Sequence, residues 1–141
     1  MPFKTICAGI SGHGDEQHTV VQALELAAEL SAKLNFIHVN DTHAGEASLA
    51  FVDHGARLDE ATLRKYVLAE SNDDDRCKAA NYDIHKGDWL QVLVGLTVDA
   101  DLLILGHHHV GSLRELFTLS KDEQIINRTH CPIMVVPTAD S

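Results

Sequence analysis

The sequence predicts a single-domain α/β protein built on an open, parallel, five-stranded sheet with helices on both faces. Short apolar runs alternate along the chain with longer segments in which apolar residues recur at helical spacing. Such alternation is typical of parallel strands joined by right-handed crossovers. The length, 141 residues, suits one domain with a substantial core. Because the chain contains no internal repeat, low-complexity tract or linker, residues 1–141 are predicted to form one domain.

The N-terminal part of the chain predicts two strands around one helix. Residues 4–10 are a short apolar run that predicts a strand, and a glycine-containing loop follows at 11–15. Asp15 is of a type that caps helices, and the apolar residues from 16 to 33 fall on one helical face. We therefore expect a helix at 16–33 and a second strand at 34–39.

The central part predicts two further helices around a third strand. Residues 40–56 show no clean period and predict a loop, whereas residues 57–70 predict a helix. The polar residues 71–76 predict a solvated turn. A short strand is expected at 82–86, and the segment 88–98 predicts a helix with almost no polar face. Either that helix packs on two sides, or it offers a contact surface to another chain.

The C-terminal part predicts a strand, a loop, a helix and a last strand. An apolar run that ends on Gly106 predicts the fourth strand at 101–105. Ser120, with a glutamate three residues later, forms a capping box for a helix at 120–129. The fifth strand is expected at 133–136, between two prolines. The loop after Gly106 lies at the carboxyl end of its strand, where open α/β sheets bind ligands, so it is the first candidate for a binding site.

Composition and charge exclude several classes of protein. The formal net charge of −10 argues against a surface that follows nucleic-acid phosphates. No apolar stretch reaches membrane-spanning length, and the N-terminus lacks the basic and apolar regions of a signal peptide. The three cysteines have no metal-like spacing and predict a reducing environment. We therefore expect a cytoplasmic protein that binds neither nucleic acid nor membrane.

Five segments of the sequence resemble the universal stress protein family in their order and spacing. They are TICAGISG, ALELAAELSAKLNFIHV, KGD, LILGHHH and THCPIMVVP. They are similar, in turn, to the family's first strand and loop, its first helix and second strand, the turn after its third strand, and its fourth and fifth strands. The resemblance spans nearly the whole chain and implies the strand order 3-2-1-4-5 in a universal stress protein domain.

The resemblance also implies a site and an assembly. In this strand order, the loops after the first and fourth strands face each other across a crevice. The candidate binding residues of this crevice are Ser11, Val39, Gly106, His107, His109, Gly111 and Ser120. The family's fifth strand pairs with a second copy across a two-fold axis, which implies a homodimer with Met134 and Val136 near the dyad.

The nucleotide-binding branch of the family carries the pattern G-x2-G-x9-G-[ST] after strand four, where glycines let backbone N–H groups approach phosphates. Gly106 and Ser120 match the two ends of this pattern, whereas His109 and Leu119 replace its second and third glycines. Ser11 stands where the family usually has Asp. With these departures, the chain resembles the A-type branch of the family, which is regarded as not binding ATP.

We therefore predict a dimeric regulator or binding module of the stress response, without tight ATP binding and without a cofactor. The alternative is an ATP or AMP binder with a degenerate phosphate loop, in which Gly111 partly restores flexibility. A hydrolase or phosphotransferase is less favoured, because no acid and base are paired at convincing spacing, and no catalytic residue is predicted. The run His107–His109 predicts no metal site, because adjacent histidines rarely converge on one ion. His38, within a strand, is expected to be buried and hydrogen-bonded.

Overall fold

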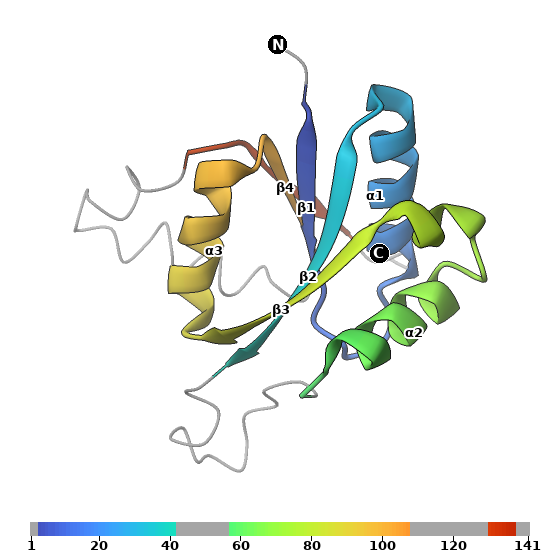
Figure 1. The fold of residues 1–141 in the computed structure, drawn as a ribbon, viewed down its shortest axis with the longest axis horizontal. Coiled ribbons are helices and arrows are strands. Elements are labelled where there is room, and N and C mark those ends of the chain that lie inside the picture. The colour runs from blue at the N-terminus through green and yellow to red at the C-terminus, as the bar shows by residue number, and fades with distance from the viewer. Residues whose placement is uncertain (1–2, 42–56, 108–129, 138–141) are drawn as a thin grey trace.

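The computed structural model describes residues 3–41, 57–107 and 130–137, and it shows a sheet with α1 and α2 on one face and α3 on the other (Figure 1). Its elements are β1 (Thr5–Gly9), α1 (Gln17–Leu30), β2 (Lys33–Asp41), α2 (Glu60–Glu70), the 3₁₀ helix η2 (Asp75–Ala79), β3 (Asn81–Gly87), α3 (Trp89–Asp99), β4 (Leu102–Gly106) and β5 (Ile133–Val136). The helix predicted at 120–129 lies outside the described residues. None of the described helices is long and apolar enough to cross a bilayer.

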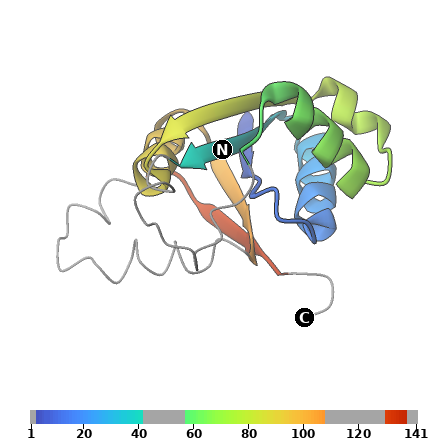
Figure 2. The same cartoon turned by 90° about the horizontal axis from the view of Figure 1, so that it is seen from below.

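The five strands form one parallel sheet in the order β3-β2-β1-β4-β5, which confirms the predicted fold class and strand order. β1 lies at the centre, where Ile6 pairs with Leu34 of β2 on one side and with Leu102 of β4 on the other. β3 and β5 are therefore the two outer strands, at opposite ends of the sheet (Figure 2). All carboxyl ends of the strands meet at one edge, because every pair is parallel.

The two faces of β1 belong to two separate apolar cores. Successive side chains of a strand point to opposite faces. Ile6 and Ala8 therefore pack in the core under α1 and α2, whereas Cys7 packs in the core under α3. β4 is fully buried along its length, as expected for a strand covered on both faces.

Two local expectations from the sequence were wrong, the second only in part. Asp15 does not cap α1: its φ is +62°, and the N-cap position belongs to Glu16, whose side chain makes no cap hydrogen bond. The solvated turn predicted at 71–76 is confirmed for the exposed Asn72 and Asp73 but is wrong for Ser71, which is buried and organises the connection between α2 and η2.

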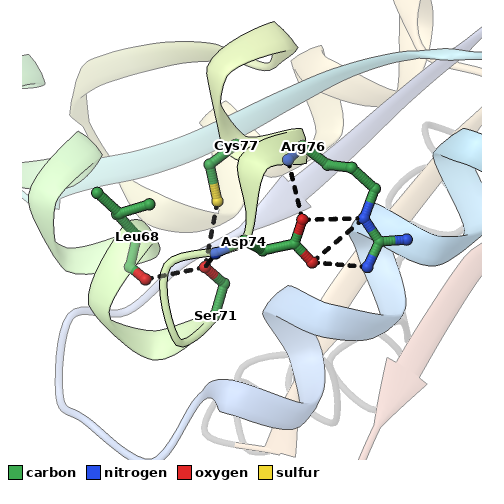
Figure 3. A network of polar contacts seen from close by, with 5 residues as sticks. All are labelled: Leu68, Ser71, Asp74, Arg76 and Cys77. Carbon is green, nitrogen blue, oxygen red and sulfur yellow. Dashed lines mark hydrogen bonds and ion pairs between the residues drawn. The ribbon is translucent and has the colours of Figure 1, made fainter.

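Ser71 holds this connection through three contacts of its hydroxyl group (Figure 3). The hydroxyl donates to the Leu68 carbonyl at 2.8 Å, accepts from the Asp74 N–H at 3.1 Å, and lies 3.3 Å from the Cys77 Sγ. Asp74 then pairs with Arg76, whose Nη2 lies 2.6 Å from the Asp74 Oδ2. The Arg76 guanidinium and backbone N–H hold the pKa of Asp74 below its usual value. The chain is thereby turned into β3 by local polar contacts.

Candidate functional site

Four of the candidate crevice residues lie where the strands end. Gly9 of β1 pairs with Leu105 of β4, so Ser11 follows β1 at the edge where Gly106 and His107 follow Leu105. Ser11, Gly106 and Val39 of β2 are buried, whereas His107 is exposed. The candidates His109, Gly111 and Ser120 lie outside the described residues.

The loop after β1 is closed by the side chain of Glu16. The Ser11 N–H donates to Glu16 Oε2 at 3.0 Å, and the Gly12 N–H donates to Glu16 Oε1 at 3.0 Å. Glu16 is only 1% exposed, so its carboxylate is held in the protein interior by these donors. Gly12 and Gly14 have φ values of +82° and +86°, which L side chains rarely adopt. The two glycines allow the loop to curl around the carboxylate.

Tyr66 of α2 and Glu70 complete this cluster. The Tyr66 hydroxyl donates to Glu16 Oε1 at 2.6 Å and accepts from the Gly14 N–H at 2.8 Å. The same hydroxyl lies 3.3 Å from Glu70 Oε1, which accepts from the Glu16 N–H at 2.7 Å. Burial and the hydrogen bond to the Glu16 carboxylate raise the pKa of Tyr66, so its hydroxyl remains a proton donor at neutral pH.

The bonds from this loop to Glu16 affect whether the loop can bind an anion from solution. Backbone N–H groups in a curled, glycine-containing loop form a potential anion site. Here the N–H groups of Ser11 and Gly12 already bind a carboxylate of the protein itself. A phosphate at these two donors would have to displace Glu16 and would meet its negative charge. The Ser11 hydroxyl is also engaged, since it accepts from the His13 N–H at 3.2 Å.

Gly106 is explained by packing rather than by a ligand. A Cβ at this position would lie 2.7 Å from the Oγ1 of Thr19, a buried residue of α1. Real Cβ atoms essentially never approach another heavy atom so closely, so the glycine lets α1 pack against the end of β4. The match of Gly106 to the first glycine of the phosphate pattern therefore has a structural explanation of its own.

Two further residues shape the edge of the sheet. His38 is buried, and its Nδ1 lies 2.8 Å from the Ile10 carbonyl, which confirms the prediction of a buried, hydrogen-bonded histidine. The amide of Asn40 accepts from the Leu58 N–H and donates to the Leu58 carbonyl, both at 3.0 Å. Asn40 thus fixes the residues before α2 against the end of β2.

The sequence predicted the position of this edge but missed Glu16, Tyr66, Thr19 and Asn40. Glu16 left no capping-box signal, because it is the N-cap residue itself and accepts from N–H groups four and five residues before it. Tyr66 left no signal either, because its partners lie far away in the sequence. In the described part of the chain, no three His, Cys, Asp or Glu side chains are grouped so that they could hold a metal ion.

Comparison with known proteins identifies the family. The profile of the universal stress protein family matches residues 2–137. The chain belongs to this family. No curated protein sequence matches it significantly.

Solved structures of universal stress proteins share the fold. One, in complex with cAMP, is 22% identical in sequence with a TM-score of 0.59, and the alignment covers 99% of this chain and 100% of that one. A second, from Burkholderia pseudomallei, is 21% identical with a TM-score of 0.59 and coverages of 96% and 97%. A third, from Archaeoglobus fulgidus in complex with dAMP, is 14% identical with a TM-score of 0.56 and coverages of 96% and 99%. At these identities, the likeness shows the fold alone.

The packing of Gly106 can be tested by adding a methyl group. Gly106→Ala should lower the free energy of unfolding by about 1–3 kcal/mol, because the new Cβ overlaps the Thr19 hydroxyl. Adding Thr19→Ala should recover most of that loss. The control is Gly95→Ala in α3, where a Cβ meets nothing within 4 Å; it should stabilise the helix by up to about 1 kcal/mol. Chemical denaturation measures all three, and a Gly106→Ala variant as stable as the wild type would contradict this explanation.

The cluster around Glu16 predicts an effect of Tyr66→Phe on stability and on its pH dependence. Loss of the hydroxyl should lower the free energy of unfolding by about 1–3 kcal/mol, because the hydroxyl donates a hydrogen bond to a buried carboxylate. Tyr82→Phe is the matched control, since the Tyr82 hydroxyl donates to a neutral acceptor, the Cys77 carbonyl, and its loss should cost about 1 kcal/mol.

The raised pKa of Tyr66 fixes the direction of the pH effect. The stabilisation is fully present below the unfolded-state pKa of tyrosine, about 10, and is lost as pH rises beyond it, because only the unfolded chain then ionises. The stability difference between wild type and Tyr66→Phe should therefore shrink above about pH 10. A difference that stayed constant or grew in urea titrations would refute the assignment.

Proposed function

We propose that this universal stress protein is a cytoplasmic, homodimeric regulator or binding module of the stress response, that it is not an enzyme, and that it does not bind ATP tightly. The observation that carries the last point is the Glu16 carboxylate on the N–H groups of Ser11 and Gly12. These donors lie on one side of the expected crevice and are already satisfied by a negative charge. The replacement of two motif glycines by His109 and Leu119 supports the same conclusion.

The alternative function is the binding of an adenine nucleotide. It is favoured by the two structural relatives that were solved in complex with cAMP and with dAMP. In this chain, such a ligand would need to avoid the first loop or to displace Glu16. The two functions therefore predict different affinities for adenine nucleotides, and these affinities can be measured.

The proposal of a homodimer rests on β5. This strand is the outer strand at one end of the sheet, and Met134 and Val135 are 38% and 42% exposed. A short, uncharged, apolar edge strand favours pairing with another chain. Val136, which was also expected near the dyad, is instead buried in the core under α1 and α2. We therefore expect Met134 and Val135 to form the dimer surface.

Calorimetric titration with ATP and AMP tests whether the protein binds an adenine nucleotide. Wild type should show no micromolar affinity, because the first loop presents a carboxylate where a phosphate would need N–H donors. The variant His109→Gly/Leu119→Gly restores the motif glycines, and we expect it to gain about tenfold in affinity only when Glu16→Gln also removes the charge. Micromolar binding by the wild type would favour the alternative function.

Light scattering at high micromolar concentration tests the dimer. Wild type should have the mass of two chains, and Met134→Lys should shift it towards one, because a charge would be buried at the paired edge. Val98→Lys is the matched control: Val98 is an exposed valine of α3, 61% exposed, and its replacement should leave the mass unchanged. A monomeric wild type would remove the proposal.

A further inference from the structure

A cavity of about 410 Å³, open to solvent on one side, lies between the sheet and α3. Small-molecule sites in proteins start at about 300 Å³, so this volume is sufficient for a small ligand. β1 contributes Thr5 and Cys7, which precede the carboxyl end of the strand. The cavity is therefore separate from the crevice that follows β1 and β4. Its lining residues from α3 place it on the face of the sheet that α3 covers, and Figure 1 shows α3 on that face.

One stripe of α3 forms a wall of this cavity. Val92, Gly95, Leu96 and Asp99 line it, at spacings of three, four and seven residues, which place them on one helical face. A Cβ at Gly95 would meet no atom within 4 Å, so close packing does not explain this glycine. Glycine inside a helix costs about 1 kcal/mol relative to alanine. Gly95 is exposed and lines the cavity, so a larger side chain at this position would enter open space beside it.

The polar groups of the cavity are mostly negative or neutral. Asp83 of β3 and Asp99 of α3 line it with exposed side chains, and within the described residues neither carboxylate has an ion-pair partner. The Asn35 amide nitrogen lies 3.9 Å from the buried Cys7 Sγ. Burial, and to a smaller extent the two carboxylates, raise the pKa of Cys7, so its thiol is uncharged at neutral pH. His85 adds an imidazole, which accepts an N–H when neutral.

We propose that this cavity binds a small organic cation, an ammonium group carried on an apolar body. The apolar body would pack against Ile37, Val92 and Leu96, and the ammonium would lie towards the carboxylates of Asp83 and Asp99. Each carboxylate could make a charge-assisted contact with the ammonium, since neither has an ion-pair partner among the residues that the structure describes. The net charge of −10 favours the approach of a cation over an anion. A bare metal ion fits less well, because the described residues offer no group of three suitable ligands.

The probe for this proposal is 2-phenylethylammonium, with 2-phenylethanol and 3-phenylpropanoate as its uncharged and anionic analogues. Binding to the full chain is followed by calorimetry and by NMR shifts of the Gly95 and Asp99 amides. We expect saturable binding of the ammonium compound, binding about tenfold weaker for the alcohol, and none for the carboxylate. Equal binding of the ammonium compound and the alcohol, or no saturable binding of the ammonium compound, would overturn the proposal.

Two variants test separately the space in the cavity and the charge of its carboxylates. Gly95→Leu should narrow the cavity with a bulky side chain, keep or raise the melting temperature because leucine favours helix, and abolish binding. Asp83→Asn/Asp99→Asn changes only exposed side chains and should weaken binding of the ammonium compound about tenfold while leaving the alcohol unchanged. Asp75→Asn, whose carboxylate in η2 is 93% exposed and outside the lining, is the charge control and should bind like wild type. Full binding by either test variant would show that the ligand lies elsewhere.

Discussion

The structure depends on the central position of β1. Its backbone is paired with β2 on one side and β4 on the other, and its side chains enter a separate core on each face. The register of a strand held in this way is strongly specified, because a shift by one residue would exchange the side chains of the two cores. Parallel pairing then sends every carboxyl end to the same edge, which is why Ser11, Val39, Gly106 and His107 meet there although they are far apart in the sequence.

At that edge, the anion bound by the first loop is a carboxylate of the protein itself. Glu16 occupies the N–H donors of the first loop, and Tyr66 ties the same carboxylate to α2. These bonds and the positive φ of Gly12 and Gly14 curl the loop around the internal carboxylate. Residues that match a phosphate pattern can thus have structural roles, as the contact between Gly106 and Thr19 also shows.

The apolar character of α3 has more than one cause. Leu93 is fully buried against the sheet, as expected for a crossover helix. Leu96 packs against the same core and also lines the cavity, Val92 lines the cavity, and Val98 is exposed to solvent. The hypothesis that this helix simply packs on two sides therefore explains only part of its sequence. One apolar stripe of α3 lines the cavity, and Val98 lies on a different, exposed face of the helix.

The sequence by itself determined the alternation of strands and helices, because periodicity and turn residues act over a few neighbouring positions. Its resemblance to the family also implied the strand order, which the structure has. Only the tertiary structure decided what the first loop binds, since the bond from Tyr66 to Glu16 joins residues 50 positions apart. The reason for Gly106 likewise depends on how closely α1 approaches β4, and a distance between packed elements leaves no local pattern in the sequence.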